Sequence, residues 1–381
     1  VAVITTSLSP DGSLFAYSLS DAGRDWQIIK LRETATGTER PDVLRYVKFT
    51  SIAWYGDGFF YSRFPAQDPE STAPSRQMSV YYHRLGTDQE DDTLVFTNAD
   101  DPDPGYIPVV TEDEQYLVLI EWEGTSHENG LLYRPIDATE PFTRLVSTGV
   151  ARHDFIEHHD GSFIVLTDLD APNGRIVAIP LDRAGERDEL VAETDTPLEW
   201  AAAAGGRLIA GRLRDASHRV EMYRLDGTPA GEIPLPAPGT VTGLTGLLSD
   251  PVVYIGFESF LYPPTALQWD GTSVIKFAGA APPLDPADFI VERHMATSTD
   301  GATVGMFVLR AAATGLPAPV ELYGYGGFNI SLTPQFDPAR LAFVASGGVA
   351  VIANLRGGNE HGEEWHRAGM LGNKQQVFDD F

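Results

Sequence analysis

Short turn sequences, each followed at once by an apolar, strand-like run, recur through the first three quarters of the chain. They are spaced 44 to 56 residues apart and comprise Asp11-Gly12, Asp57-Gly58, Asp113-Glu114, Asp160-Gly161, Gly205-Gly206 and Ser249-Asp250. Turn residues ahead of such runs are typical of β-hairpins, and a β-rich repeat of this length is typical of propeller blades of about four strands each. We therefore predict about six blades of a β-propeller, with an array of β-sandwiches as the alternative.

The charge of the chain restricts its partners. Its 54 acidic and 27 basic residues give a net charge of −27, and only four of the cations are lysines. A surface this negative repels nucleic acid and anionic lipid. We therefore expect neither a nucleic acid nor a membrane as a partner.

Cysteine content and hydropathy exclude further classes of protein. The chain has no cysteine, which rules out disulfides, thiol nucleophiles and thiolate-ligated metal. It contains no run of about 18 apolar residues, and its first residues lack the charged and apolar regions of a signal peptide. We expect no cofactor, no metal ion and a cytoplasmic location, with a periplasmic location as the alternative.

The pattern changes near Pro283. Strand-like segments at 289–293 and 303–310 are followed by an apolar run at 317–325, a helical segment at 338–345 and a continuous apolar segment at 348–354. Strands that alternate with glycine-rich turns and a helix are typical of an α/β domain. We predict a β-propeller, incomplete at its N-terminus, over residues 1–283 and the first part of an α/β domain over residues 284–381.

A glycine-rich turn at 324–327 lies at the end of the apolar run, where open α/β sheets place their ligands. Tyr325 in this turn offers a phenolic donor to a developing oxyanion. A purely structural turn, with Tyr325 as an ordinary core residue, is an alternative that the spacing leaves open. A dinucleotide-binding fingerprint fails because Asn329 stands where its third glycine belongs.

Other candidate chemistry is weaker. His361 and His366 are five residues apart, not the four that zinc proteases use to place two imidazoles on one helical face. No Gly-x-Ser-x-Gly nucleophile elbow occurs in the sequence. The acidic runs at 88–92 and 100–103 are predicted to be solvated turns, and the pair His158-His159, which precedes a turn, is predicted to be solvated.

Four stretches are specific enough to indicate a family: 322–330 (Leu-Tyr-Gly-Tyr-Gly-Gly-Phe-Asn-Ile), 353–358 (Ala-Asn-Leu-Arg-Gly-Gly), 360–366 (Glu-His-Gly-Glu-Glu-Trp-His) and 373–381. They closely resemble prolyl oligopeptidases, and segments at 41–44, 47–49 and 81–88 look like the propeller of the same family. The resemblance covers the whole chain. It implies a seven-bladed propeller that caps an α/β-hydrolase domain, and a Ser-Asp-His triad that cleaves short peptides on the carboxyl side of proline.

The resemblance also implies roles for individual residues. Tyr325 would be the oxyanion-hole tyrosine, and Phe328 would stack on the substrate proline. Phe49 and Ile107 would reach the more distal substrate residue from propeller loops. The implied partners are short proline-containing peptides, admitted past the propeller of a monomer.

The chain departs from the family pattern in two ways. Residues 122–125 read Trp-Glu-Gly-Thr where relatives carry Arg-Glu-Gly-Cys, so an inhibitory thiol is impossible there and one substrate-facing cation is replaced. The family's triad residues lie downstream of the segment that matches 378–381. We therefore expect one piece of a longer enzyme, inactive without its C-terminal segment. A noncatalytic propeller that binds peptides or proteins is the alternative, and the failed fingerprint disfavours an NAD enzyme.

Overall fold

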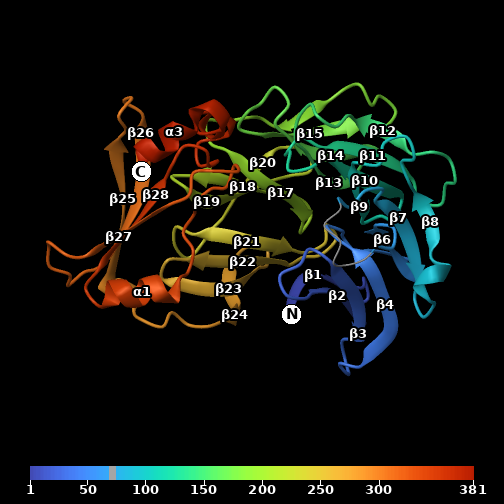
Figure 1. Ribbon diagram of the computed structural model, residues 1–381, viewed down its shortest axis with the longest axis horizontal. Helices are drawn as coiled ribbons and strands as arrows, with labels where there is room; N and C mark the ends of the chain where they lie inside the picture. Colours follow the sequence, from blue (N-terminus) through green and yellow to red (C-terminus); the bar gives the residue numbers. More distant parts are fainter. Residues whose placement is uncertain (68–73) are drawn as a thin grey trace. The chain divides into compact units, whose positions relative to one another are not determined.

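The computed structural model describes residues 1–67 and 74–381 (Figure 1). Contacts divide the chain into two compact units, Val1–His158 and His159–Phe381, which are described separately. The α-helices of the described residues all lie beyond residue 337. No helix among them is long and apolar enough to cross a membrane.

The first unit contains three four-stranded sheets, ordered β1-β2-β3-β4, β5-β6-β7-β8 and β12-β11-β10-β9. Strands that are neighbours in sequence pair antiparallel. Their bounds are β1 Ala2–Leu8, β2 Leu14–Ser20, β3 Gln27–Glu33, β4 Glu39–Val47, β5 Ala53–Tyr55, β6 Gly58–Arg63, β7 Ser79–Arg84, β8 Thr93–Phe96, β9 Gly105–Val110, β10 Tyr116–Trp122, β11 Gly130–Pro135 and β12 Thr143–Val146, with the 3-10 helix η1 Gln89–Asp91 before β8.

The same pattern continues in three further sheets, ordered β13-β14-β15-β16, β17-β18-β19-β20 and β21-β22-β23-β24. The division between the two units falls within β13, His153–His159. The remaining bounds are β14 Ser162–Thr167, β15 Arg175–Pro180, β16 Asp188–Val191, β17 Leu198–Ala204, β18 Arg207–Arg214, β19 Ser217–Tyr223, β20 Pro229–Ile233, β21 Thr240–Thr245, β22 Val253–Ser259, β23 Tyr262–Trp269 and β24 Val274–Gly279.

The turns that define the sequence repeat all occupy the same place in these sheets. Each of the six joins the first strand of a sheet to its second, as Asp11-Gly12 does between β1 and β2. A sheet of four consecutive strands is the unit of a propeller. The prediction of about six blade-like units is therefore confirmed.

Neighbouring sheets within a unit share apolar cores. In the first unit, Ile29 and Leu44 of the first sheet pack in one cluster with Phe59 and Tyr61 of the second. In the second unit, Ile209 belongs to a cluster that joins the sheet of β17–β20 to the sheet of β21–β24. Neighbouring sheets within a unit therefore bury facing surfaces against each other, which explains why the strands contain apolar runs as well as alternating patterns.

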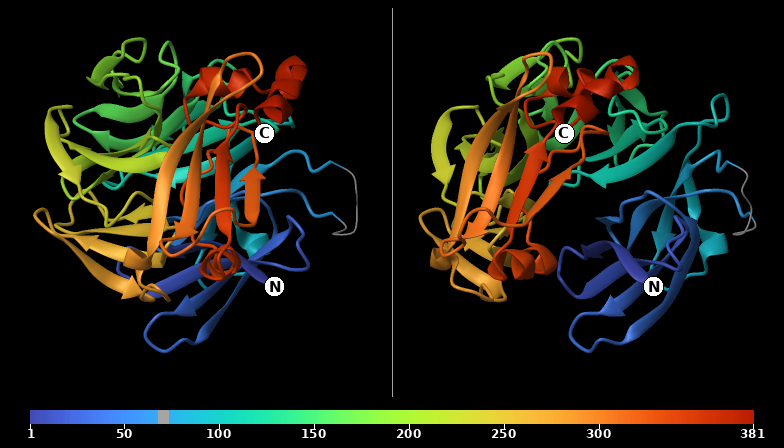
Figure 2. Two further views of the ribbon diagram at one scale, coloured as in Figure 1. Left: turned by 90° about the vertical axis from the view of Figure 1, so that its left-hand side faces the viewer. Right: turned by 60° about the vertical axis from the view of Figure 1, so that its left-hand side comes forward.

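The end of the second unit is a mixed sheet with the order β25-β26-β28-β27 (Figure 2). The strands are β25 Phe289–Thr297, β26 Thr303–Ala311, β27 Val320–Gly324 and β28 Val349–Asn354. β28 pairs antiparallel with β26 and parallel with β27. The parallel pair requires a crossover, which contains helix α1, Pro338–Ala345.

Local chemistry explains where α1 begins. The Asp337 carboxylate accepts hydrogen bonds from the backbone N–H groups of Ala339 at 2.8 Å and Arg340 at 3.1 Å, and Pro338 occupies the first turn. Two short helices follow β28, α2 Glu363–Arg367 and α3 Lys374–Asp380, with the 3-10 helix η3 Leu371–Asn373 between them. A further 3-10 helix, η2 Pro286–Asp288, precedes β25.

Two of the groups predicted to be solvated are buried. The Asp92 side chain, at the end of the acidic run 88–92, is fully buried and lies 2.7 Å from His83, and the Tyr61 hydroxyl donates to it at 2.6 Å. The His158 side chain is nearly buried, with its Nδ1 2.6 Å from Asp113. Both predictions were wrong because the partners come from other strands and turns, which the local sequence does not reveal.

Candidate functional site

The turn after β27 is shaped by close backbone packing. Gly326 has a φ of +60°, and a Cβ there would lie 2.4 Å from the Val377 side chain and 2.7 Å from the Arg356 carbonyl oxygen. Gly357 in the neighbouring turn is equally restricted, since its Cβ would lie 2.6 Å from the Gly326 carbonyl. The two glycine turns therefore meet backbone to backbone, and a side chain at either position would separate them.

Helix α3 holds this turn in place. The Lys374 ammonium donates to the Gly326 carbonyl oxygen at 2.5 Å, which is a charge-assisted hydrogen bond. Figure 1 places α3 and α1 at opposite ends of the C-terminal sheet, so the turn after β27 lies at the α3 end. The position of Tyr325 is thus tied to a helix almost fifty residues further along the chain.

An ion cluster anchors α3 in turn. The buried Arg356 guanidinium donates to both carboxylate oxygens of Asp380, at 2.6 and 2.9 Å, and also contacts Asp300 at 2.5 Å. The Asp380 side chain has no solvent exposure. Burial alone raises the pKa of Asp380, but the guanidinium outweighs it and the pKa is lowered.

Tyr325 itself is not a core residue. Its side chain is 43% exposed, and among residues 1–67 and 74–381 its hydroxyl has no hydrogen-bond partner. A phenol that is held by its backbone and has a free hydroxyl can donate to an incoming group without breaking an internal bond. The alternative of a structural core tyrosine does not fit this geometry.

Phe328 and Asn329 continue the turn in a strained conformation. Both have positive φ angles, of 52° and 57°, which cost free energy for residues other than glycine. The Asn329 N–H donates to the Gly357 carbonyl at 3.2 Å, and His366 Nδ1 lies 2.8 Å from the same oxygen. The Asn329 N–H also lies 3.2 Å from His366 Nδ1, so the three groups form one cluster. These bonds hold the Phe328 ring, which is 78% exposed, away from the core.

A buried carboxylic acid lies beside the turn. Glu360 is 3% exposed, and one of its oxygens accepts hydrogen bonds from the Leu332 N–H at 2.8 Å and the Asn354 amide at 3.3 Å. Its other oxygen has no hydrogen-bond partner among the residues that the structure describes. Burial raises the pKa of Glu360 to about 7, so this group changes charge near neutral pH.

One serine of this region has acidic and basic neighbours. The Ser331 hydroxyl donates to Glu199 at 2.6 Å, and His218 Nε2 lies 2.9 Å from the other oxygen of the same carboxylate. The acid therefore stands between the serine and the histidine. An activated serine needs the histidine next to it, so this trio does not provide a nucleophile.

Of the predicted substrate-contacting residues of the first unit, Ile107 lies on the β9–β10 hairpin, and Phe49, in the loop between β4 and β5, packs against that hairpin. The Phe49 ring, 50% exposed, packs edge-on against Trp122 with ring centroids 5.7 Å apart. Ile107 pairs with Ile120, two residues before Trp122 on β10, so Ile107 shares the face of the β9–β10 hairpin that bears Trp122. Phe49 therefore packs on the Trp122 side chain, whose face of the hairpin also bears Ile107. Tyr325 and Phe328 are likewise neighbours in the second unit.

Sequence reasoning assigned no role to Lys374, Arg356 or Glu360. The sequence could have indicated two of them. Arg356 and Glu360 flank the Gly357-Gly358 turn directly after the buried strand β28. Charged residues at such buried positions need partners. No local signal identifies Lys374, whose contact lies 48 positions away in sequence.

Comparisons with known proteins identify the family. Residues 1–274 match the family described as prolyl oligopeptidase, N-terminal beta-propeller domain, and residues 334–381 match the prolyl oligopeptidase family. A prolyl endopeptidase of Elizabethkingia meningoseptica is 32% identical over 99% of this chain and 54% of its own length. The prolyl oligopeptidase ophP of Omphalotus olearius is 33% identical over 98% of this chain and 54% of its length.

Solved structures give the same result. Prolyl oligopeptidase B from Galerina marginata, bound to a 25mer macrocyclization substrate, has a TM-score of 0.92 at 26% identity, covering 100% of this chain and 57% of that one. A structure from a study of two prolyl endopeptidases has a TM-score of 0.81 at 37% identity, covering 100% of this chain and 56% of that one. The chain thus spans about half the length of the relatives that it matches. Its fold is a β-propeller followed by the first part of an α/β-hydrolase domain, and the chain belongs to the prolyl oligopeptidase family.

Proposed function

We propose that this chain is part of a serine endopeptidase that cleaves short peptides on the carboxyl side of proline through an acyl-enzyme. The observation that carries the proposal is the free, half-exposed hydroxyl of Tyr325 on a turn fixed by Gly326 and Lys374. Residues 1–283 form the propeller in this account, and residues 284–381 begin the catalytic domain. No residue of the chain is assigned to the serine, histidine or aspartate of the triad in this account.

Tyr325 is the oxyanion donor in this account. When the serine attacks the prolyl carbonyl, negative charge develops on the carbonyl oxygen, and a hydroxyl already in position stabilises it without reorganisation. The Gly326 and Gly357 contacts and the Lys374 hydrogen bond supply this pre-organisation. The histidine transfers the serine proton to the leaving amine.

Phe328 provides the face for the substrate proline. Its exposed ring stands three residues after Tyr325, on backbone held by Gly357 and His366. A flat aromatic ring suits a rigid, apolar pyrrolidine. Phe49 and Ile107 contact the more distal substrate residue from the propeller, which controls the access of peptides in this account.

The test compares Tyr325→Phe with Tyr323→Phe in the full-length protein. Both tyrosines are 43% exposed, and only Tyr325 lies in the turn. With a chromogenic substrate that has proline at the cleavage position, we expect kcat to fall by about 100-fold to 1,000-fold for Tyr325→Phe and to change little for Tyr323→Phe. Full turnover by Tyr325→Phe refutes the role of its hydroxyl.

A noncatalytic peptide-binding module is the second candidate. One observation favours it. Ser331 and His218 both contact Glu199 and not each other, so this trio does not supply a nucleophile for catalysis. Equilibrium dialysis of the 381-residue chain against a proline peptide, with and without a separately produced C-terminal segment, separates the two candidates. The peptidase requires that segment for hydrolysis, whereas the binding module gives binding without hydrolysis in both experiments.

A further inference from the structure

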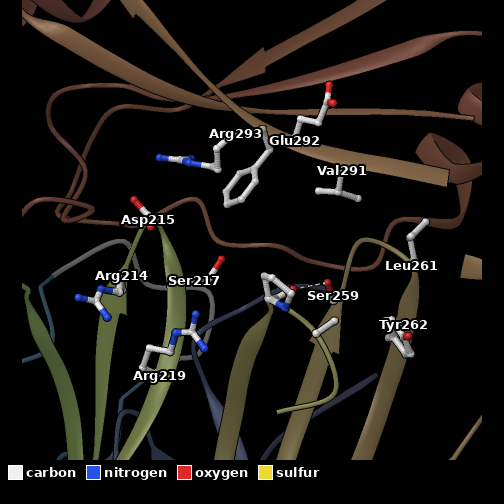
Figure 3. Close-up of a pocket in the computed structure, with 13 residues that line it drawn as sticks. Arg214, Asp215, Ser217, Arg219, Ser259, Leu261, Tyr262, Val291, Glu292 and Arg293 are labelled. Carbon is white, nitrogen blue, oxygen red and sulfur yellow. Dashed lines mark hydrogen bonds between the residues drawn. The ribbon is translucent and has the colours of Figure 1, made fainter. Parts of the chain in front are cut away.

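A cleft of about 260 Å³ opens in the second unit (Figure 3), and its lining includes no residue of the turn that bears Tyr325. One side is formed by the β18–β19 hairpin, and the other by β25 with the loop between β22 and β23. Its lining includes three arginines, Arg214, Arg219 and Arg293, and the apolar residues Leu261 and Val291. Two carboxylates, Asp215 and Glu292, also line it.

Strand register places two of the arginines together. Arg214 pairs directly with Ser217 across the hairpin, and Arg219 lies two residues beyond Ser217 on β19. Paired residues, and residues two apart on a strand, share one face. Arg214 and Arg219 therefore project from the same face of the hairpin, which borders the cleft in Figure 3.

These two guanidinium groups are not neutralised. Both are exposed, and within residues 1–67 and 74–381 neither forms an ion pair, a hydrogen bond or a ring contact through its side chain. This is unusual in a chain with a net charge of −27. By contrast, Asp215 interacts electrostatically with Arg293. Glu292 lies 3.4 Å from His294, which forms an ion pair with it only when protonated.

The hairpin tip is packed against the core of the C-terminal sheet. Asp215 and Ala216 form its two-residue loop with φ angles of 51° and 53°, the pattern of a type I′ turn, which usually contains glycine or asparagine. Ala216 is fully buried and packs in a cluster with Phe260 and Phe307. This packing offsets the strain and fixes the direction in which Arg214 leaves the turn.

The opposite wall is also fixed. The Arg293 guanidinium lies 4.4 Å above the Phe307 ring and donates a hydrogen bond to Asn354. A Cβ at Gly305 would lie 2.4 Å from Arg293, so glycine at this position makes room for the guanidinium. Burial lowers the pKa of Arg293, but an arginine remains charged at any ordinary pH.

We propose that this cleft binds a small organic carboxylate with an apolar body, of the class of N-acylated amino acids and peptide C-terminal residues. Arg214 and Arg219 bind the carboxylate, for which the planar guanidinium offers paired donors. Leu261 and Val291 contact the apolar side chain. The volume lies just below the range of about 300 to 1,000 Å³ typical of ligand pockets, which suits a ligand the size of one amino acid. The proposal does not depend on the proposed peptidase chemistry.

The test measures binding of N-acetyl-leucine to the full chain by saturation-transfer NMR, with N-acetyl-leucinamide and inorganic phosphate as comparison probes. We expect the carboxylate to bind at least about tenfold more tightly than the amide, because the amide lacks the charge. Added salt weakens the binding, since both arginines are exposed. Equal affinity for the amide overturns the proposal, as does phosphate binding as tightly as N-acetyl-leucine, which indicates an unspecific anion patch.

Variants locate the site. Arg214→Gln and Arg219→Gln are each expected to weaken binding about fivefold or more, whereas Arg187→Gln, an exposed arginine on a distant loop, leaves it unchanged. Val291→Asp places a negative charge on the cleft wall and abolishes binding without removing an arginine. All four substitutions are at exposed positions, and thermal melting by circular dichroism confirms the fold. Unchanged affinity in both arginine variants overturns the proposal.

Discussion

Two carboxylic acids are almost equally buried in different parts of the molecule, and their pKa values shift in opposite directions. Asp42, in the first propeller sheet, is 2% exposed, and Glu360, beside the Tyr325 turn, is 3% exposed. Burial alone raises the pKa of both. The outcome is nevertheless a lowered pKa for Asp42 and a pKa of about 7 for Glu360.

The difference lies in the partners of each group. Asp42 accepts a hydrogen bond from the Gly86 N–H at 2.5 Å and lies 3.2 Å from His83, which also contacts Asp92. Within the described part of the chain, Glu360 receives two neutral donors on one oxygen and none on the other. Hydrogen-bond donors and nearby cations, rather than the degree of burial, therefore decide whether a buried carboxylic acid is charged. Asp42 belongs to an anchor between two sheets, whereas Glu360 is free to titrate near a candidate active site, where such shifts concentrate.

Removing His83, whose imidazolium pairs with Asp42 and Asp92, is expected to change the free energy of unfolding most. His83→Ala leaves the fully buried side chains of Asp42 and Asp92 without it, and we expect a loss of about 3 to 5 kcal/mol in the free energy of unfolding at pH 6. His294→Ala removes an exposed histidine and is the control. Urea denaturation measures both, and a loss below about 1 kcal/mol for His83→Ala contradicts the anchor.

The same histidine predicts a pH dependence. Burial opposes the charged imidazole, but Asp92 and Asp42 outweigh it and raise the pKa of His83. Its stabilising contribution is therefore complete below the unfolded-state pKa of about 6.5 and is lost as the pH rises through the higher folded-state value. The difference between wild type and His83→Ala should shrink in that window, and a difference that grows with pH is incompatible with the proposed pairing.

Glu360→Gln is expected to have the next largest effect, with the opposite sign. Between an ordinary value of 4.5 and the raised pKa of about 7, the folded state binds more protons than the unfolded state. Stability therefore falls as the pH rises through this window, by about 3 kcal/mol in total. The glutamine variant loses this slope and is the more stable protein at pH 8. If the free energy of unfolding has the same pH slope in both proteins, the pKa of Glu360 is not raised, which contradicts the prediction.

Lys374→Met is expected to have a smaller effect, confined to the turn. It removes the charge-assisted bond to Gly326, and we expect a loss of about 1 to 2 kcal/mol because Lys374 is partly exposed. Amide hydrogen exchange should become faster at 325–329. Lys276→Met is the matched control, because Lys276 donates to the Ala280 carbonyl at 2.8 Å on the surface. Equal exchange in the two variants would mean that α3 does not hold the turn.

The parts of the molecule that sequence could predict are those set by neighbouring residues. The turn at Asp11-Gly12 and its five counterparts indicated the first hairpin of each sheet, since turn chemistry is local. The helix at 338–345 and the buried strand β28 were predicted for the same reason. The turn of Tyr325 was identified from its glycines and from the resemblance of its surroundings to a known family.

Long-range contacts could not be predicted. His83 meets Asp42 from 41 positions away, and Lys374 meets Gly326 from 48 positions away. The free oxygen of Glu360 depends on how two turns and a strand close around it. No repeat length or composition carries this information, because partner choice is made by the packed fold.

The central claim is that the Tyr325 hydroxyl binds an oxyanion and not the substrate as such. The most direct measurement compares the affinity of full-length Tyr325→Phe for two ligands: a peptide aldehyde with proline at the reactive position, which forms a tetrahedral adduct, and the corresponding proline amide, which does not. The account predicts that aldehyde binding weakens by about 100-fold or more while amide binding is unchanged. Equal loss of affinity for the two ligands, or no loss for either, would contradict it.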